Sequence, residues 1–101
     1  ALGAAQPRVE VAIVDPTTGA VVRHLAAGVL GKNPPPPLAP NALAQKIAWD
    51  GQDDYGQDVA GPSKMAVRVR AGMQVKLETI VGGNPYVCVE VYPSYLYVYV
   101  N

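Results

Sequence analysis

Apolar and polar residues alternate along much of the chain, and the spacing of three to four residues that is typical of a helix does not recur. In residues 8–15, RVEVAIVD, the alternation puts Val9, Val11 and Ile13 on one face. Successive side chains of a β-strand point to opposite faces of the sheet, so this pattern predicts a strand with one buried face.

Similar short patterns predict six further strands, and turn residues separate several of them. In the turn at residues 15–19, Pro16 fixes its own backbone φ angle and Gly19 tolerates a positive one. The sequence GGNP at 82–85 is a second turn signal. The predicted strands lie at residues 20–25, 46–50, 63–71, 73–81, 86–92 and 95–100. Seven short strands with turns between them predict an all-β fold, an antiparallel β-sandwich.

Two of these strands carry polar residues opposite their apolar ones, which predicts one buried and one solvated face for each. The strand at 63–71 sets Met65, Val67 and Val69 against two arginines. The strand at 73–81 sets one apolar group against one polar group: Met73, Val75 and Leu77 against Gln74, Lys76 and Glu78.

Residues 31–44, GKNPPPPLAPNALA, form a proline-rich segment between two predicted strands. Its four consecutive prolines are Pro34, Pro35, Pro36 and Pro37. Consecutive prolines favour an extended polyproline II rod and cannot pair within the centre of a sheet. We therefore predict a long surface loop, with a partner-binding motif as the alternative.

The segment IAWDGQDDYGQDVAG, residues 47–61, concentrates acidic residues and glycines. An EF-hand calcium loop that began at Asp50 would need glycine at its sixth position and glutamate at its twelfth, where the chain has Tyr55 and Gly61. A looser calcium site is the alternative, with Asp50, Asp53, Asp54 and Asp58 as ligands. Aspartate and glycine are also the residues that tight turns require for local reasons. We therefore interpret the segment as a turn without catalytic residues.

Three segments together resemble the immunoglobulin-like domain of the flagellar hook-capping family, a module found in many exported bacterial proteins. They are VEVAIVDPTTGAVVRHL, the W-D-G-x-D-x-x-G element at 49–56, and VRVRAG, so the resemblance covers roughly residues 9–71. It implies an immunoglobulin-like sandwich in which Trp49 fills the core and Asp50, Gly51 and Gly56 shape the corner. Residues 73–101 extend beyond the match, and we expect the whole of 1–101 to form one domain.

Composition excludes several other function classes. Eight basic residues balance eight acidic ones without a basic run, so neither nucleic acid nor an anionic membrane is an expected partner. No apolar run reaches the roughly 18 residues that span a bilayer, so we expect no membrane insertion. The initial ALGAA is compatible with a mature end left by a signal peptidase. We therefore expect an exported protein, extracellular or at the bacterial cell surface.

The chain offers few residues for chemistry. His24 is the only histidine and Cys88 the only cysteine, too few for a blue-copper or zinc site, and we interpret Cys88 as a buried structural thiol. Each of the two serines follows a proline, and we expect no hydrolytic triad of these serines with His24. We therefore predict a protein without enzymatic activity, cofactor or intrachain disulfide.

The last predicted strand is the feature that points to a function. Tyr95, Tyr97 and Tyr99 lie on one face and alternate with the apolar residues of the other. Tyrosine suits a half-exposed sheet face, and it is also enriched where proteins meet. Because proline rods dock on aromatic grooves, the four prolines of one copy could pack on the tyrosines of the next and build a filament. The expected partner is thus the protein itself or a neighbouring domain, and the alternative function is carbohydrate binding.

Overall fold

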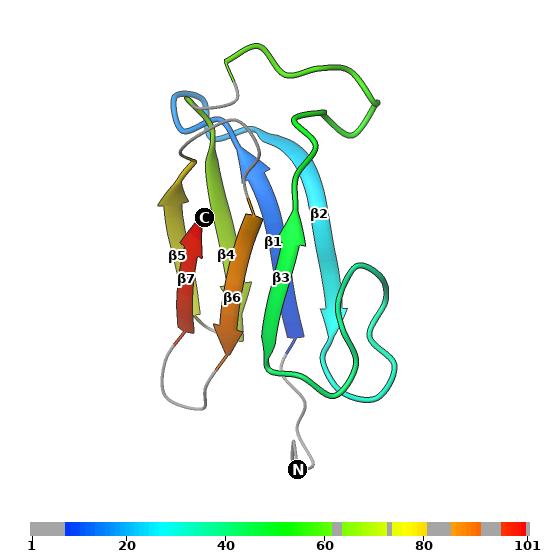
Figure 1. Ribbon diagram of the computed structural model, residues 1–101. Helices are drawn as coiled ribbons and strands as arrows, with labels where there is room; N and C mark the ends of the chain where they lie inside the picture. Colours follow the sequence, from blue (N-terminus) through cyan, green and yellow to red (C-terminus); the bar gives the residue numbers. More distant parts are fainter. Residues whose placement is uncertain (1–7, 62–63, 73, 81–85, 92–95, 101) are drawn as a thin grey trace.

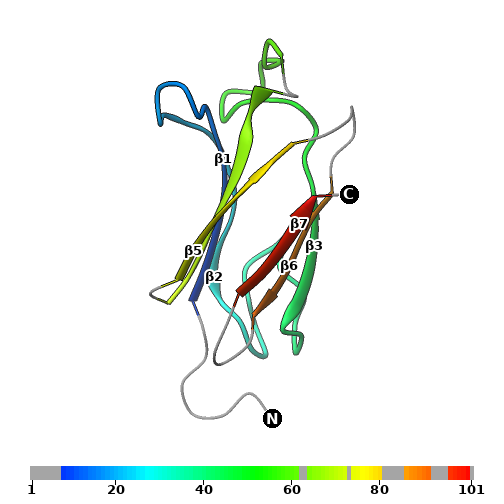
Figure 2. The same ribbon diagram turned by 90° about the vertical axis from the view of Figure 1, so that its left-hand side faces the viewer.

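The computed structural model describes residues 8–61, 64–72, 74–80, 86–91 and 96–100, and within these ranges all regular elements are strands except for an isolated helical residue at Lys64. They are β1 (Arg8–Val14), β2 (Val21–Val29), β3 (Ala44–Ala48), β4 (Ala66–Ala71), β5 (Gln74–Thr79), β6 (Tyr86–Val91) and β7 (Leu96–Val100). They form two antiparallel sheets that face each other (Figures 1 and 2). The predicted seven-stranded antiparallel β-sandwich is confirmed.

The strand order is β2-β1-β4-β5 in one sheet and β3-β6-β7 in the other. A constant-type immunoglobulin domain also divides its strands into four and three. Its four-stranded sheet has the order A-B-E-D, in which the second strand pairs with the fifth. In this protein the first strand pairs with the fourth, since Val11 lies opposite Val69 and Ile13 opposite Val67. The β1–β2 hairpin is therefore attached to the sheet through β1, which leaves β2 at the edge.

The core lies between the two sheets. Val9, Val11 and Ile13 of β1 are buried, as the alternation predicts, and they lie beside the buried valines of β4. The opposing layer comes from β6 and β7, whose inward residues include Val87, Val89, Leu96 and Val98. Trp49, directly after β3, packs in the same cluster. Burial of these apolar side chains is the main force that holds the two sheets together.

β5 differs from the expectation. Val75 and Leu77 are 55% and 62% exposed, although the alternation places them on the apolar face of the strand. The register explains this, because Val75 lies opposite Arg70 and Leu77 opposite Arg68, on the outer face of the sheet. The core-facing side of β5 carries Lys76 and Glu78 instead. The expected residue Met73 lies outside the described residues.

The four prolines do not form the predicted straight rod. A polyproline II helix has no internal hydrogen bonds, yet the backbone N–H of Leu38 donates to Pro35 O across 3.0 Å. The physical reason is burial. Leu38 packs in the core, so the chain must turn back towards the sheets directly after the prolines. The prediction of a rod is therefore wrong, whereas the prediction of a proline-rich loop is confirmed.

Candidate functional site

The turn that contains the four aspartates is held by their own side chains. Asp53 Oδ1 accepts hydrogen bonds from the backbone N–H groups of Tyr55, at 2.9 Å, and Gln57, at 3.0 Å. Asp50 Oδ1 accepts one from Gln52 N at 3.0 Å. Gly51 and Gly56 have φ angles of 80° and 79°, which residues with a Cβ rarely adopt. The aspartates thus cap local backbone donors, and the glycines permit the bend.

Arg23 of β2 joins this turn to the four-stranded sheet. Its Nη1 atom lies 3.3 Å from Asp50 Oδ1, and the same nitrogen donates to the backbone oxygens of Gln52, at 3.3 Å, and Asp53, at 3.2 Å. The indole N–H of Trp49 also donates to Gln52 O, at 2.9 Å. One guanidinium and one indole therefore fix the start of the turn against the core.

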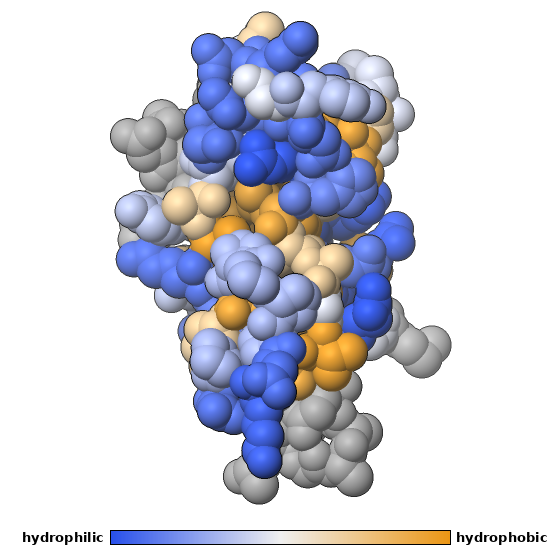
Figure 3. Space-filling model, turned by 90° about the vertical axis from the view of Figure 1, so that its right-hand side faces the viewer, coloured by the Kyte–Doolittle hydropathy of each residue, from blue (hydrophilic) through white to orange (hydrophobic). Residues whose placement is uncertain are grey.

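Asp54 connects the turn to the outer edge of β2. Its backbone N–H donates to Val22 O at 3.1 Å, and its Oδ1 accepts from His24 N at 2.8 Å. Its Oδ2 lies 2.6 Å from His24 Nδ1. The turn thus occupies backbone groups on the edge of β2 that would otherwise be open. Figure 3 shows hydrophilic side chains gathered at this end of the molecule.

The contact between Asp54 and His24 predicts a dependence of stability on pH. The hydrogen bond from the His24 backbone, followed by that of its side chain, lowers the pKa of Asp54 from its ordinary value of 3.8. A carboxyl with a lower pKa in the folded state binds fewer protons there than in the unfolded chain. Its contribution is therefore present above the unfolded pKa and is lost as the pH falls through the folded pKa. When the pH is lowered from neutral to about 3, we expect the free energy of unfolding to fall less for the Asp54→Asn variant than for the natural protein. Urea denaturation at each pH measures this difference.

The matched control for this experiment is Asp58→Asn. The Asp58 carboxylate is exposed, and among the described residues its one hydrogen-bond contact is with Gln52 Nε2, at 3.5 Å. We expect Asp58→Asn to keep the pH dependence of the natural protein. An Asp54→Asn variant whose stability changes with pH as much as that of the natural protein would contradict this role of Asp54.

The described aspartates do not converge on a common point. Asp50 and Asp53 cap the backbone inside the turn, Asp54 faces β2, and Asp58 faces the Gln52 side chain. Within the described ranges, no three side chains of His, Cys, Asp or Glu come together so that they could hold a metal ion. The alternative calcium site therefore has no converging set of ligands among these residues.

A tyrosine face covers the outside of the three-stranded sheet. We use this name for Tyr86, Tyr97 and Tyr99, which are 44%, 52% and 40% exposed. Tyr97 lies opposite Glu90 and Tyr99 opposite Cys88 on β6, and Tyr86 lies opposite Ala48 on β3. The ring centroids of Tyr97 and Tyr99 are 5.3 Å apart, with an angle of 46° between the planes. The predicted residue Tyr95 lies outside the described residues.

Two neighbours of the tyrosine face were not identified from the sequence. Lys46 of β3 places its Nζ 4.5 Å from the centroid of the Tyr86 ring, a cation–π contact. Cys88 is 7% exposed. Its side-chain hydrogen bond with Tyr99 contributes most to raising the pKa of Tyr99 above its ordinary value. The alternation of Tyr86, Cys88 and Glu90 against three valines was a signal for this face in the sequence.

The structure does not bring the prolines and the tyrosines of one chain together. Pro35, Pro36 and Pro37 are exposed and Pro34 is half-buried, in the loop between β2 and β3. The tyrosines Tyr97 and Tyr99 belong to β7, at the other edge of the three-stranded sheet (Figure 1). A contact between these two groups would therefore have to join two copies of the chain.

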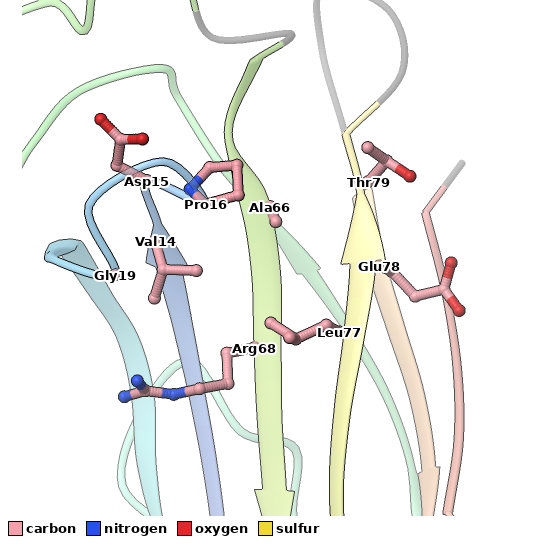
Figure 4. Close-up of a pocket in the computed structure, with 9 residues that line it drawn as sticks. All are labelled: Val14, Asp15, Pro16, Gly19, Ala66, Arg68, Leu77, Glu78 and Thr79. Carbon is pink, nitrogen blue, oxygen red and sulfur yellow. The ribbon is translucent and has the colours of Figure 1, made fainter.

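A groove of about 380 Å³ lies on the outer face of the four-stranded sheet, next to the β1–β2 turn (Figure 4). Val14, Pro16, Ala66 and Leu77 give it an apolar lining. Its charged lining residues, Asp15, Arg68 and Glu78, point in different directions in Figure 4. Among the described residues that line the groove, these three do not form an ion pair with one another.

Comparisons with models of known protein families, with curated proteins and with solved structures gave no match. No helix among the described residues is long and apolar enough to cross a membrane.

Proposed function

We propose that this chain is a non-enzymatic structural or assembly module of an exported bacterial protein, which associates with copies of itself through β7 and the proline-rich loop. The observation that carries the proposal is the tyrosine face. Three large aromatic side chains lie exposed on one face of the three-stranded sheet, and two of them have neighbouring rings on β7. Tyrosine loses little conformational entropy on binding and contributes much of the energy of protein interfaces.

The aspartate turn supports a structural role for the rest of the chain. Its carboxylates cap backbone groups and contact Arg23 and His24, so their hydrogen-bonding capacity is used within the fold. The resemblance to the immunoglobulin-like domain of the flagellar hook-capping family agrees with a structural corner at Trp49 and with an exported protein. On that basis we propose an extracellular or cell-surface location.

The double substitution Tyr97→Ser and Tyr99→Ser tests the proposal. We expect the natural protein to sediment as species heavier than its 10.6 kDa chain, because association buries the tyrosine rings. The double variant should have a dissociation constant at least tenfold higher, since each buried aromatic anchor contributes more than 1 kcal/mol to typical interfaces. Analytical ultracentrifugation measures both.

Tyr55→Ser is the matched control, because Tyr55 is also an exposed tyrosine but lies on the aspartate turn. We expect this variant to associate like the natural protein. If the natural protein and the double variant are both monomers at every concentration, the assembly proposal fails.

Carbohydrate binding is the alternative function, and the ring geometry counts against it. Sugar rings stack on flat aromatic platforms, whereas the planes of Tyr97 and Tyr99 are inclined to each other by 46°. A monomer that binds oligosaccharides, and loses this binding in the Tyr97→Ser and Tyr99→Ser variant, would favour the carbohydrate-binding function over assembly.

A further inference from the structure

Three of the four sheet edges carry features that hinder pairing with another chain. An edge strand exposes unpaired backbone groups, and proteins protect such edges with charges, bulges or covering segments. The edge of β2 is covered by Asp54, and its pairing with β1 contains register shifts. β5 places Lys76 and Glu78 on its core-facing side, opposite Val69 and Val67. β3 has Lys46 at its centre.

Among the described residues, the fourth edge strand, β7, has no charge, no bulge and no covering segment hydrogen-bonded to it, although β5 of the opposite sheet runs close beside it. Its sequence Leu96–Val100 is LYVYV, with neither charge nor proline, and its register with β6 is unbroken. In the described part of the chain, β7 pairs with β6 alone. Its core-facing side carries the buried aliphatic residues Leu96 and Val98, and its outer side carries the exposed Tyr97 and Tyr99. β-Branched and aromatic residues such as valine and tyrosine favour strands. An uncharged, regular edge of this kind is a template for another strand.

We infer that the partner of this edge is the β7 strand of a second copy, added in antiparallel orientation about a two-fold axis through Val98. The two three-stranded sheets then become one six-stranded sheet with the order β3-β6-β7-β7-β6-β3. The inference rests on the proposed self-association and specifies its first contact as an edge-to-edge pairing. A two-fold contact of this kind is closed, so larger assemblies would use a second surface.

The register follows from the side chains. Residues directly opposite each other in a sheet lie on the same face, so odd positions must meet odd positions and even positions even ones. The register centred on Val98 is the one that satisfies this rule and pairs all five residues of both strands. It sets Tyr97 of each copy opposite Tyr99 of the other, and Leu96 opposite Val100. Aromatic pairs therefore form on the outer face and aliphatic pairs on the core side.

This register makes a charge-swap experiment possible. In the variant Tyr97→Lys with Tyr99→Lys, each introduced lysine lies opposite a lysine of the other copy. In the matched variant Tyr97→Lys with Tyr99→Glu, each lysine lies opposite a glutamate. Both variants change only exposed positions of β7 and remove the same two rings. Circular dichroism and thermal unfolding establish that both are folded, and sedimentation equilibrium gives their masses and dissociation constants.

We expect the natural protein to form a dimer of twice 10.6 kDa. The Lys/Lys variant should have a dissociation constant at least tenfold higher than that of the Lys/Glu variant, because like charges directly opposite each other oppose strand pairing. The dimer of the Lys/Glu variant should also weaken as salt is added, since salt screens exposed ion pairs.

The outcomes separate this inference from the proposed function. Equal dissociation constants for the two variants, with a natural protein that still associates, would overturn edge pairing and leave assembly through another surface. A natural protein that remains monomeric at every concentration would overturn both.

Discussion

Trp49→Ala is expected to lower the free energy of unfolding by about 3–5 kcal/mol, as the loss of a buried aromatic side chain does in other proteins. Trp49 is 3% exposed and packs in the core cluster between the sheets, so alanine would leave a large cavity. The substitution also removes the hydrogen bond from the indole to Gln52 O. Domains of this size are stable by about 5–15 kcal/mol, so the variant would lose a large part of its stability. Urea denaturation measures the change.

Two control variants separate burial from the hydrogen bond. Trp49→Phe keeps an aromatic ring in the core but removes the indole N–H, and we expect it to cost about 1–2 kcal/mol. Tyr55→Ala removes an exposed aromatic side chain six positions away and should change stability by less than about 0.5 kcal/mol. Similar losses for Trp49→Ala and Tyr55→Ala would mean that Trp49 does not lie in the interior.

The positions of the buried residues in the central strands could be predicted well from the sequence. A central strand has a neighbour on each side and one face against the second sheet, so its apolar residues are buried on that face. β1 lies between two neighbours and faces the second sheet, so its alternating Val9, Val11 and Ile13 are all buried. The turn from Asp15 to Gly19 was also predictable, since it depends on residues within five positions. Its Gly19 has a φ angle of 76°, and Gly19 N donates to Asp15 O at 2.7 Å.

The prediction failed for β5 because alternation gives the period of a strand and not the face that meets the core. That face is set by the pairing with β4, in which Leu77 lies opposite Arg68. At the edge of the sheet the core-facing side is less completely covered, so Lys76 and Glu78 can lie there. Apolar residues on the outer face of an edge strand are therefore compatible with the fold.

The candidate site could be predicted only in part. The residue types of the aspartate turn indicated a turn, but the hydrogen bonds of Asp54 to Val22 and His24 join positions about thirty residues apart. Such contacts are set by the fold and not by local sequence. The two described tyrosines of β7 could be predicted from alternation within one strand, whereas Tyr86 and Lys46 join them through the register of β3, β6 and β7.

The proline loop gives the second large prediction, at Gly28 of β2. A glycine inside a strand usually costs about 0.5–1 kcal/mol relative to alanine, so propensity alone predicts that Gly28→Ala stabilises the protein. A Cβ atom at this position would clash with Pro35 Cδ and would lie 2.5 Å from Pro35 Cγ. The proline ring is rigid and cannot rotate away, and overpacking of this kind costs typically about 1–3 kcal/mol. We therefore expect a net loss of about 1–2 kcal/mol in urea denaturation.

A double-mutant cycle with Pro35→Ala identifies the cause of that loss. Removing the ring opens space for the new methyl group, so Gly28→Ala should be less destabilising, or even stabilising, when Pro35 is alanine. The coupling energy between two residues in contact is expected to be about 0.5–3 kcal/mol. If Gly28→Ala raises the stability of the natural protein, Pro35 does not rest on β2. The loop would then be held by Leu38, which packs in the core, and by Gln45, whose side chain bonds to the backbone of Ala39 and Ala42.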